Sequence, residues 1–416
     1  MACHRQPWLL LLLLVWPWSG QAAEAIAAEL AARHPERARG SLSLRIGQRL
    51  EQALAAYQHA EITRAITLLR GLEGASPFEQ AQIDRFLGNL YAIEAQYAKA
   101  SQHLVAAIGS DQLSAVDHAQ ALRLRADLAL QQQQYAEAIS HYQQWLDFTG
   151  GELADVYLRQ AQAHYQLKQY AQMIAPLERA IALSPKPDKN AYLLKLASYY
   201  ERQLYPQALT VLEQLVAHFA DDKRWWVQLG MLYLYTGDQG RALATLEGAY
   251  LAGLLSSENE IRTLIQLYAH NGIPHRAARL QQQALDKGLL AADETNLATQ
   301  ARYWLAAKEL QQALRLYQQL AAASGNGEYA RQAGQIQLQL QEYAAAIASF
   351  EQALALDAKP QGPIYLDIAR AHLQREQLVE AYRWVIKARQ QPQSAAVAGQ
   401  WARYIEARAR RQGLSL

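Results

Sequence analysis

The chain has 416 residues, of which 40 are Lys or Arg, 38 are Asp or Glu and only one is Cys. With 51% hydrophobic and 19% charged residues, it is too apolar to be a disordered chain. The near-neutral balance excludes a nucleic-acid binder that works by bulk charge, and a single Cys excludes a disulfide or zinc framework.

Residues 1–23 have the pattern of a secretory signal peptide. Arg5 precedes an apolar run over residues 8–16, and Gly20 and Ala22 supply the small residues that a signal peptidase reads. The apolar run falls well short of the roughly 20 residues that a membrane-spanning helix needs. We therefore expect cleavage after residue 22 or 23, which would also remove the only cysteine, Cys3. Residues 24–44 are predicted to be a loosely ordered leader, with a short helix near residues 25–33 at most.

A spacing of about 35 residues recurs from residue 45 to residue 393, close to the roughly 34 of one common helical repeat. The clearest unit has Trp226, Leu229, Gly230 and Tyr233 in a first helix and Ala242 in a second. We expect the Trp226 ring to be buried. The predicted units open at Arg49, Asp84, Leu122, Tyr157, Tyr192, Trp226, Ile261, Leu297, Ala330 and Tyr365.

A column of small residues in the first helices supports this register. A small side chain there lets two paired helices approach closely. The column contains Gly88, Ala126, Ala161, Gly230, Ala301, Gly334 and Ala369. No alternation typical of strands is found, so the fold is predicted to be all-α.

This spacing resembles the tetratricopeptide repeat (TPR). The resemblance implies a right-handed superhelical solenoid of about ten helix-turn-helix repeats. Residues 394–416 are predicted to form a C-terminal capping helix and tail, with Val397, Trp401 and Ile405 on one stripe.

The usual catalytic constellations are missing from the sequence. It has no metalloprotease, serine-hydrolase or phosphate-loop motif, and no Cys nucleophile. His141, His164 and His218 have no second ligand three or four residues away. We therefore predict no catalytic, cofactor-binding or metal-binding residues, and a protein that is not an enzyme.

A binding surface is predicted where the first helices line the concave face of the array. Arg recurs there with Gln or Tyr, which suits an extended peptide with carboxylates or backbone acceptors. The sequence leaves open whether the groove holds a peptide or a helix. The predicted groove residues are Arg85, Asn89, Arg159, Gln162, Tyr200, Arg224, Gln228, Tyr235, Arg262, Gln266, His270, Arg302, Arg331 and Gln335.

Some TPR domains clamp a carboxylate with basic and Asn residues on successive first helices. Arg85, Asn89 and Arg159 resemble parts of such a clamp. Leu124 stands where an Asn would be needed and Asp155 where a Lys would be needed, so the pattern departs from that binding mode.

Residues 223–230, 246–250 and 267–274 resemble exported TPR proteins associated with TonB-type energy-transduction systems of Gram-negative bacteria. The shared features are a Trp-Val-Gln-Leu opening at residues 226–229, an aromatic-rich first helix and an Asn-Gly-Ile-Pro turn at residues 271–274. The resemblance implies a soluble periplasmic scaffold that is an accessory of TonB-dependent transport.

The implied partners are proteins, including components of a TonB, ExbB and ExbD complex, with no nucleic acid and no small-molecule cofactor. The alternatives are a periplasmic scaffold in outer-membrane protein assembly or exopolysaccharide export, and, third, a cell-wall enzyme. The oligomeric state stays open.

Overall fold

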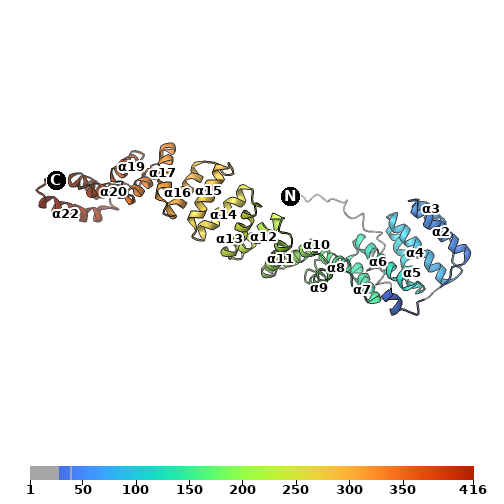
Figure 1. Ribbon diagram of the computed structural model, residues 1–416. Coiled ribbons are helices and arrows are strands. Elements are labelled where there is room, and N and C mark those ends of the chain that lie inside the picture. Colours follow the sequence, from blue (N-terminus) through green and yellow to red (C-terminus); the bar gives the residue numbers. More distant parts are fainter. Residues whose placement is uncertain (1–27, 38–39) are drawn as a thin grey trace. The chain divides into compact units, whose positions relative to one another are not determined.

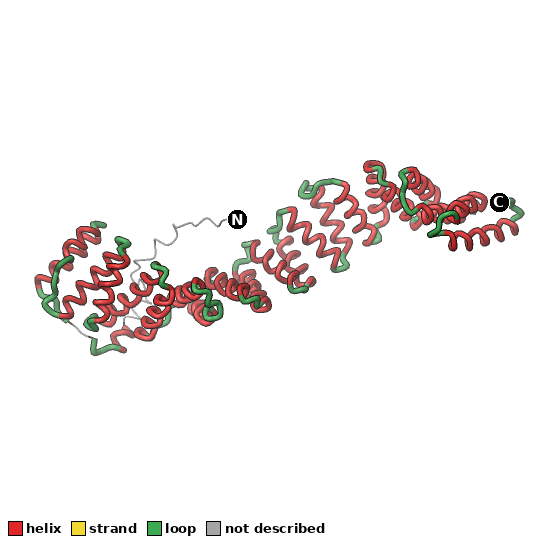
Figure 2. The backbone as a smooth tube through the Cα atoms, turned by 180° about the vertical axis from the view of Figure 1, so that it is seen from behind, coloured by secondary structure: helices red, strands yellow, loops and turns green. Residues whose placement is uncertain are grey.

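The structure is a computed structural model that describes residues 28–37 and 40–416 (Figure 1). Within these residues the regular elements are helices and none is a strand (Figure 2). The predicted signal peptide, residues 1–23, lies outside the described residues. The chain divides into two compact units, one up to His218 and one over Phe219–Leu416. The predicted all-α fold is confirmed.

The first unit contains five helix pairs in chain order, and each first helix packs on its own second helix. The pairs are α2 (Leu44–Gln58) with α3 (Ile62–Leu69), α4 (Pro77–Ile93) with α5 (Tyr97–Gly109), α6 (Ala115–Gln131) with α7 (Tyr135–Thr149), α8 (Ala154–Gln166) with α9 (Ile174–Leu183), and α10 (Lys189–Glu201) with α11 (Tyr205–His218).

The second unit contains five more pairs and one further helix. The pairs are α12 (Lys223–Tyr235) with α13 (Gln239–Leu251), α14 (Glu258–His270) with α15 (Pro274–Asp286), α16 (Glu294–Ala306) with α17 (Leu310–Ser324), α18 (Gly327–Gln339) with α19 (Tyr343–Ala355), and α20 (Gln361–Gln374) with α21 (Leu378–Arg389). The further helix, α22 (Ala395–Arg411), packs on α21. In the described part of the chain, the pairs therefore number ten, as the spacing predicts.

Side-chain caps start many of the first helices. The Ser76 hydroxyl accepts a hydrogen bond from the Glu79 amide, and Pro77 occupies the first turn, where its missing N–H costs nothing. At α14, Ser257 and Glu260 form a complete capping box. Such caps satisfy amide groups that have no partner inside the helix.

The turn inside each described helix pair contains one residue in the left-handed backbone region. The next amide then donates to a carbonyl five residues back, as Glu342 does to Gln337 at 2.9 Å. Only two of these ten residues are glycine. They are Ala60, Ala95, Gln133, Lys168, Gln203, Gly237, Gly272, Lys308, Gln341 and Glu376.

The small-residue column lies where the two helices of a pair touch. A Cβ added at Gly334 would lie 2.7 Å from the ring of Phe350, which is fully buried in α19. A Cβ added at Gly230 would likewise lie 2.7 Å from Leu246 of α13. Close approach of paired helices therefore explains this column, as predicted.

The expected burial of Trp226 is wrong. Its neighbour Trp225 is the buried ring, with 4% of its surface exposed. Trp226 is partly exposed, packs over Gly248 and donates from Nε1 to the Ala220 carbonyl oxygen at 2.9 Å. Two adjacent residues lie about 100° apart around a helix, so an error of one residue in the predicted register exchanges the buried and the exposed tryptophan.

The described part of the predicted leader packs on the first unit. Residues 28–33 are helical, and Leu30 is fully buried with Ala115 and Phe148 in one hydrophobic cluster. The His34 ring stacks on Phe148 with 4.2 Å between ring centroids, and Arg37 forms an ion pair with Asp111. These contacts attach residues 28–37 to α6 and α7. The domain boundaries expected from the sequence stay predictions.

Candidate partner-binding face

All fourteen predicted groove residues lie on the first helices of their pairs. In the first unit they are Arg85 and Asn89 on α4, Arg159 and Gln162 on α8, and Tyr200 on α10. In the second unit they are Arg224, Gln228 and Tyr235 on α12, Arg262, Gln266 and His270 on α14, Arg302 on α16, and Arg331 and Gln335 on α18. Their side chains differ in their intramolecular partners and in their exposure.

In the first unit, Arg85 links α4 to α6. Its Nη2 atom lies 3.2 Å from Oδ1 of Asp117, and Gln82 also donates to Asp117 at 3.1 Å. The Arg85 side chain is only 13% exposed, and burial lowers its pKa although the Asp117 carboxylate opposes that change. Arg85 therefore holds two consecutive first helices together.

Arg159 makes the corresponding link between α8 and α6. Its Nη1 atom donates to Oδ1 of Asp127 at 3.1 Å, with both side chains mostly buried. Arg123 of α6 reaches forward to Asp155 of α8, and Tyr142 also donates to Asp127. A partner carboxylate would have to displace these internal acids, so Arg85 and Arg159 are poorly available for capture.

The carboxylate clamp does not fit this arrangement. The position that needs a Lys is Asp155, and this acid forms an ion pair with Arg123. Arg85 and Arg159 are held by Asp117 and Asp127.

In the second unit, two links between consecutive first helices lie at the N-terminal ends of those helices. Nζ of Lys223 lies 3.0 Å from Oε1 of Glu260, and Arg262 donates to Oδ1 of Asn296 at 3.0 Å. Burial would raise the pKa of Glu260, but hydrogen bonds from the Ser257 and Ser256 amides and from Lys223 outweigh it and lower the pKa to about 2.

Past these links, the second unit presents an exposed set that we call the α12–α16 face. Met231 and Tyr235 on α12 are 49% and 70% exposed. Gln228 lies on the same side of α12, because residues three and seven positions apart share a helix face. The α12–α16 face consists of Gln228, Met231, Tyr235, Gln266, His270 and Arg302, all exposed.

Three of the four predicted arginines of the second unit pair with acids at the start of their own helix. Arg224 pairs with its N-cap residue Asp222 at 2.6 Å, Arg262 with Glu258 at 2.6 Å, and Arg331 with Glu328 at 2.5 Å. Sequence reasoning missed Met231, although its spacing from Gln228 and Tyr235 places it on the same helix face. The acidic partners of the arginines were also missed.

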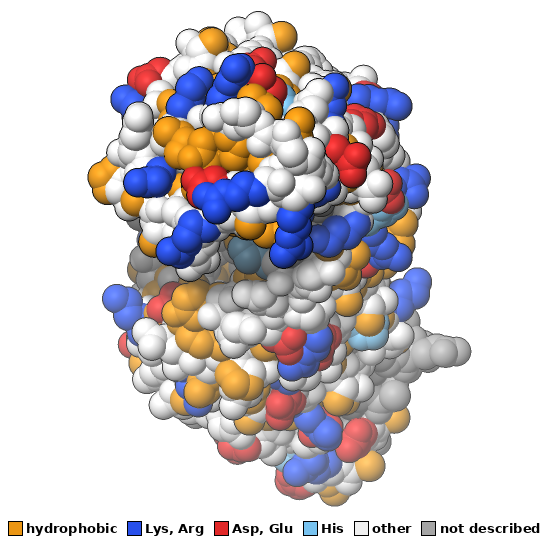
Figure 3. All heavy atoms as spheres, turned by 90° about the vertical axis from the view of Figure 1, so that its left-hand side faces the viewer, with side chains coloured by type: hydrophobic (Ala, Val, Ile, Leu, Met, Phe, Trp, Pro, Cys, Tyr) orange, Lys and Arg blue, Asp and Glu red, His pale blue; other side chains and the backbone are white. Residues whose placement is uncertain are grey.

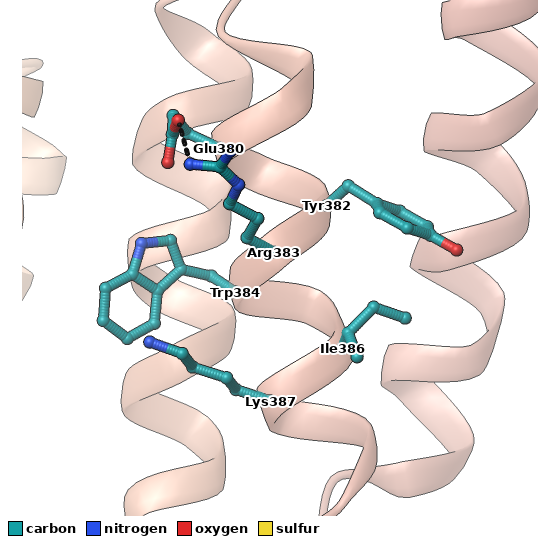
Figure 4. Close-up of a pocket in the computed structure, with 6 residues that line it drawn as sticks. All are labelled: Glu380, Tyr382, Arg383, Trp384, Ile386 and Lys387. Atoms are coloured by element: carbon teal, nitrogen blue, oxygen red, sulfur yellow. Dashed lines mark hydrogen bonds and ion pairs between the residues drawn. The ribbon is translucent and has the colours of Figure 1, made fainter. Parts of the chain in front are cut away.

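A hollow of about 520 Å³ runs along α21 (Figure 4). Glu380 and Arg383 form an ion pair beside it, and the Lys387 ammonium lies 3.8 Å from the centre of the Trp384 ring. Tyr382 and Ile386 point to the other side of the helix (Figure 4). The lining offers no nucleophile with an adjacent base. Among the described residues, no group of three or more His, Cys, Asp or Glu could hold a metal ion.

Comparison with known proteins identifies the repeat. Two family models, both described as tetratricopeptide repeat, match residues 87–152 and 193–254, and residues 154–187 and 332–360. The chain contains tetratricopeptide repeats. Such repeats serve as protein–protein interaction scaffolds, typically without enzymatic activity, and they imply that this TPR chain has protein partners.

Solved structures similar to this TPR chain share little sequence with it. A tetratricopeptide repeat protein from Parabacteroides merdae is 16% identical, covers 63% of this chain and 99% of its own, and has a TM-score of 0.38. MamA is 17% identical over 41% of this chain and 92% of its own, with a TM-score of 0.34. Naa15/Naa10 bound to HypK-THB is 14% identical over 88% and 66%, with a TM-score of 0.42. No curated protein matches the sequence.

Proposed function

We propose that this protein is an exported TPR scaffold that captures a segment of a partner protein on the α12–α16 face. The observation that carries the proposal is the exposure of Met231 and Tyr235 beside polar side chains. Tyr and Met are enriched at protein interfaces, where they supply apolar contact area next to polar groups.

The polar groups of the α12–α16 face define the partner segment. Gln228 and Gln266 can each donate and accept hydrogen bonds, which suits the backbone of an extended segment. Arg302 is exposed and donates to the Thr299 hydroxyl at 2.9 Å. A guanidinium in that setting can pair with a carboxylate. The expected segment therefore has an apolar anchor near α12 and an acidic residue near α16.

The periplasm is the proposed location, and a TonB-dependent transport system is the proposed context. The signal-peptide pattern of residues 1–23 and the resemblance of residues 223–274 to exported TonB-associated TPR proteins support both. None of the described helices is long and apolar enough to cross a membrane. Outer-membrane protein assembly or polysaccharide export is the alternative context.

Site-specific cross-linking in the periplasm tests this proposal. A photo-reactive residue at Gln266 should capture a component of the TonB, ExbB and ExbD complex. Recovery of an outer-membrane assembly machine instead would favour the alternative context. Activity on purified cell wall that one side-chain change abolishes would overturn the non-enzymatic role.

A pair of matched variants tests the face itself. Tyr235→Ala should weaken partner capture by about tenfold or more, as expected for an interface anchor, and should change the melting temperature little because the side chain is 70% exposed. Leu251 on α13 is 76% exposed and lies off this face. Leu251→Ala should therefore leave capture intact. Equal losses from both variants would remove the α12–α16 face from the proposal.

A further inference from the structure

Residues 28–37, which we call the strap, dock on helices that come much later in the chain. Their short helix buries Leu30 completely against Ala119 of α6 and Phe148 of α7. The other strap side chains are exposed or partly exposed. The core of the α6–α7 pair, which contains the fully buried Trp145, lies in a separate cluster. The strap is therefore held by few contacts, and it can leave without opening the core of this pair.

The Phe148 ring is the centre of the docking contact. His34 of the strap lies parallel to this ring, at an angle of 6°, and donates from Nε2 to the Phe148 carbonyl oxygen at 2.9 Å. The guanidinium carbon of Arg37 lies 4.9 Å from the centre of the ring. The centre of the His118 ring, on α6, lies 4.6 Å from it. Docking therefore gathers three basic side chains around one aromatic ring.

The charges in this contact balance only while the two histidines are neutral. Arg37 pairs with Asp111 in the loop before α6, and Arg33 lies beside the end of α7. Nδ1 of His34 lies 3.6 Å from Oε1 of Glu36. Lys and Arg side chains usually extend into solvent, as those at the C-terminal end of the second unit do (Figure 3), but the Arg37 side chain is only 13% exposed. Protonation of both histidines would therefore place excess positive charge beside a guanidinium that water screens little.

His118 is the residue that protonation would disturb most. It is 7% exposed, and its Nδ1 atom has no hydrogen-bond partner among the described residues. Burial lowers its pKa from 6.5 to about 4; Arg37 and His34 add to this change, and Asp111 opposes it. Because the pKa is lowered in the docked state, the contribution of neutral His118 to docking is fully present above pH 6.5. It is lost as the pH falls toward 4.

We propose that the strap is an acid-sensitive latch, which docks on α6 and α7 while His118 is neutral and detaches when His118 takes up a proton. Detachment removes Arg37 and His34 from beside the imidazole, opens it to water and leaves Asp111 near it. The coupling is reciprocal, so a strap that disfavours the proton is itself disfavoured by the proton. With a pKa of 6.5 after release, the docking equilibrium weakens by at most about 70-fold between pH 7.5 and pH 4.5. The latch belongs to the first unit and does not depend on the α12–α16 face of the second.

A distance between two spin labels tests the proposal on the chain from residue 24 onwards. This chain has no cysteine, so Ala32→Cys in the strap and Gln143→Cys in α7 can carry the two labels. Both positions are exposed. Pulsed electron paramagnetic resonance should give a short, narrow distance distribution at pH 7.5 and a longer, broad one at pH 4.5. Circular dichroism should show unchanged helix content over this range.

Variants of the labelled chain supply the controls. Leu30→Glu, a change within the strap, should give the broad distribution already at pH 7.5. His118→Gln and His118→Phe, which carry no charge at either pH, should keep the strap docked at pH 4.5; the second retains a ring beside Phe148. His103→Gln is the matched change at a histidine of α5 whose Nδ1 lies 2.7 Å from Asp84 of α4, and it should release the strap as the parent does.

Four outcomes would overturn the proposal. The first is a broad distribution in the parent at pH 7.5, which would mean that the strap is not docked. The second is an unchanged distribution at pH 4.5. The third is acid release that persists in both His118 variants, which would place the sensor elsewhere. The fourth is release that occurs only together with a loss of helix content, which would mean that the whole unit unfolds.

Discussion

Replacing a left-handed turn residue by glycine should stabilise the array. Gln341, between α18 and α19, has a φ of +63° and an exposed side chain. An L-residue pays about 1–2 kcal/mol in this conformation, whereas glycine pays roughly 0.5–1 kcal/mol in extra unfolded-state entropy. Gln341→Gly should therefore raise the free energy of unfolding by about 0.5–1 kcal/mol.

A matched control uses the same change eleven residues later. Gln352 is exposed inside α19, and Gln352→Gly should lower the stability by about 1 kcal/mol because glycine is a poor helix former. The difference between the two variants should then be about 1.5–2 kcal/mol. Gln133, Gln203 and Gln341 lie in separate turns, so the triple glycine variant should gain on the order of 1.5–3 kcal/mol.

Hydrogen exchange is the appropriate assay, because a repeat array need not unfold in one step. The amides of α18 and α19 should exchange several-fold more slowly in Gln341→Gly and about five- to tenfold faster in Gln352→Gly, since 1.4 kcal/mol corresponds to a factor of ten. A loss of protection in Gln341→Gly equal to that in Gln352→Gly would refute the left-handed turn.

Further predictions concern burial and pH. Phe350→Ala should lower the free energy of unfolding in urea by about 3–5 kcal/mol. Gly334→Ala should destabilise the parent protein but stabilise the Phe350→Ala variant, where the ring no longer opposes the added methyl group. A change of the same sign in both backgrounds would refute the contact between the two residues. Glu260→Ala should cost about 1 kcal/mol by removing a capping box and an ion pair, and no change in melting would contradict that role. Burial and the nearby Arg37 lower the pKa of His118 from 6.5 to about 4. Because the unfolded chain then binds the proton more tightly, stability should fall by on the order of 1–2 kcal/mol between pH 6.5 and 4, and His118→Gln should abolish this dependence in denaturation measured over that range.

The helix pairs could be predicted because helix packing leaves a periodic trace in the sequence. Most first helices place a small residue where the second helix crosses, as at Gly334 against Phe350. At least seven of the ten pairs have one at this position, so the sequence shows the repeat period. The repeat period does not determine to within one residue which side of a helix is buried. For this reason the sequence predicts burial of Trp226 in place of Trp225.

The left-handed turns could be predicted only where glycine occupies them. Gly237 and Gly272 signal a turn by residue type, but Lys308 and Glu376 adopt the same conformation. The cost of about 1–2 kcal/mol for each is offset by the hydrogen bonds that close the helix end and by packing of the following helix. Composition therefore hides most of these turns.

The candidate face could be predicted only in part. The sequence placed the arginines on the first helices, because their positions follow from the register. It could not reveal that Arg159 is held by Asp127, since residues 32 positions apart meet only when two repeats stack at a particular rotation. For the same reason it could not separate the internally paired arginines of the first unit from the exposed residues of the second.

The cross-links between α4, α6 and α8 bear on the mechanical behaviour of the first unit. Arg85 with Asp117 and Arg159 with Asp127 each join neighbouring repeats, and their side chains are between 11% and 24% exposed. Partly buried ion pairs are screened much less by dissolved ions than exposed pairs are. We therefore expect the elastic stiffness of the segment from α4 to α8 to vary little with ionic strength.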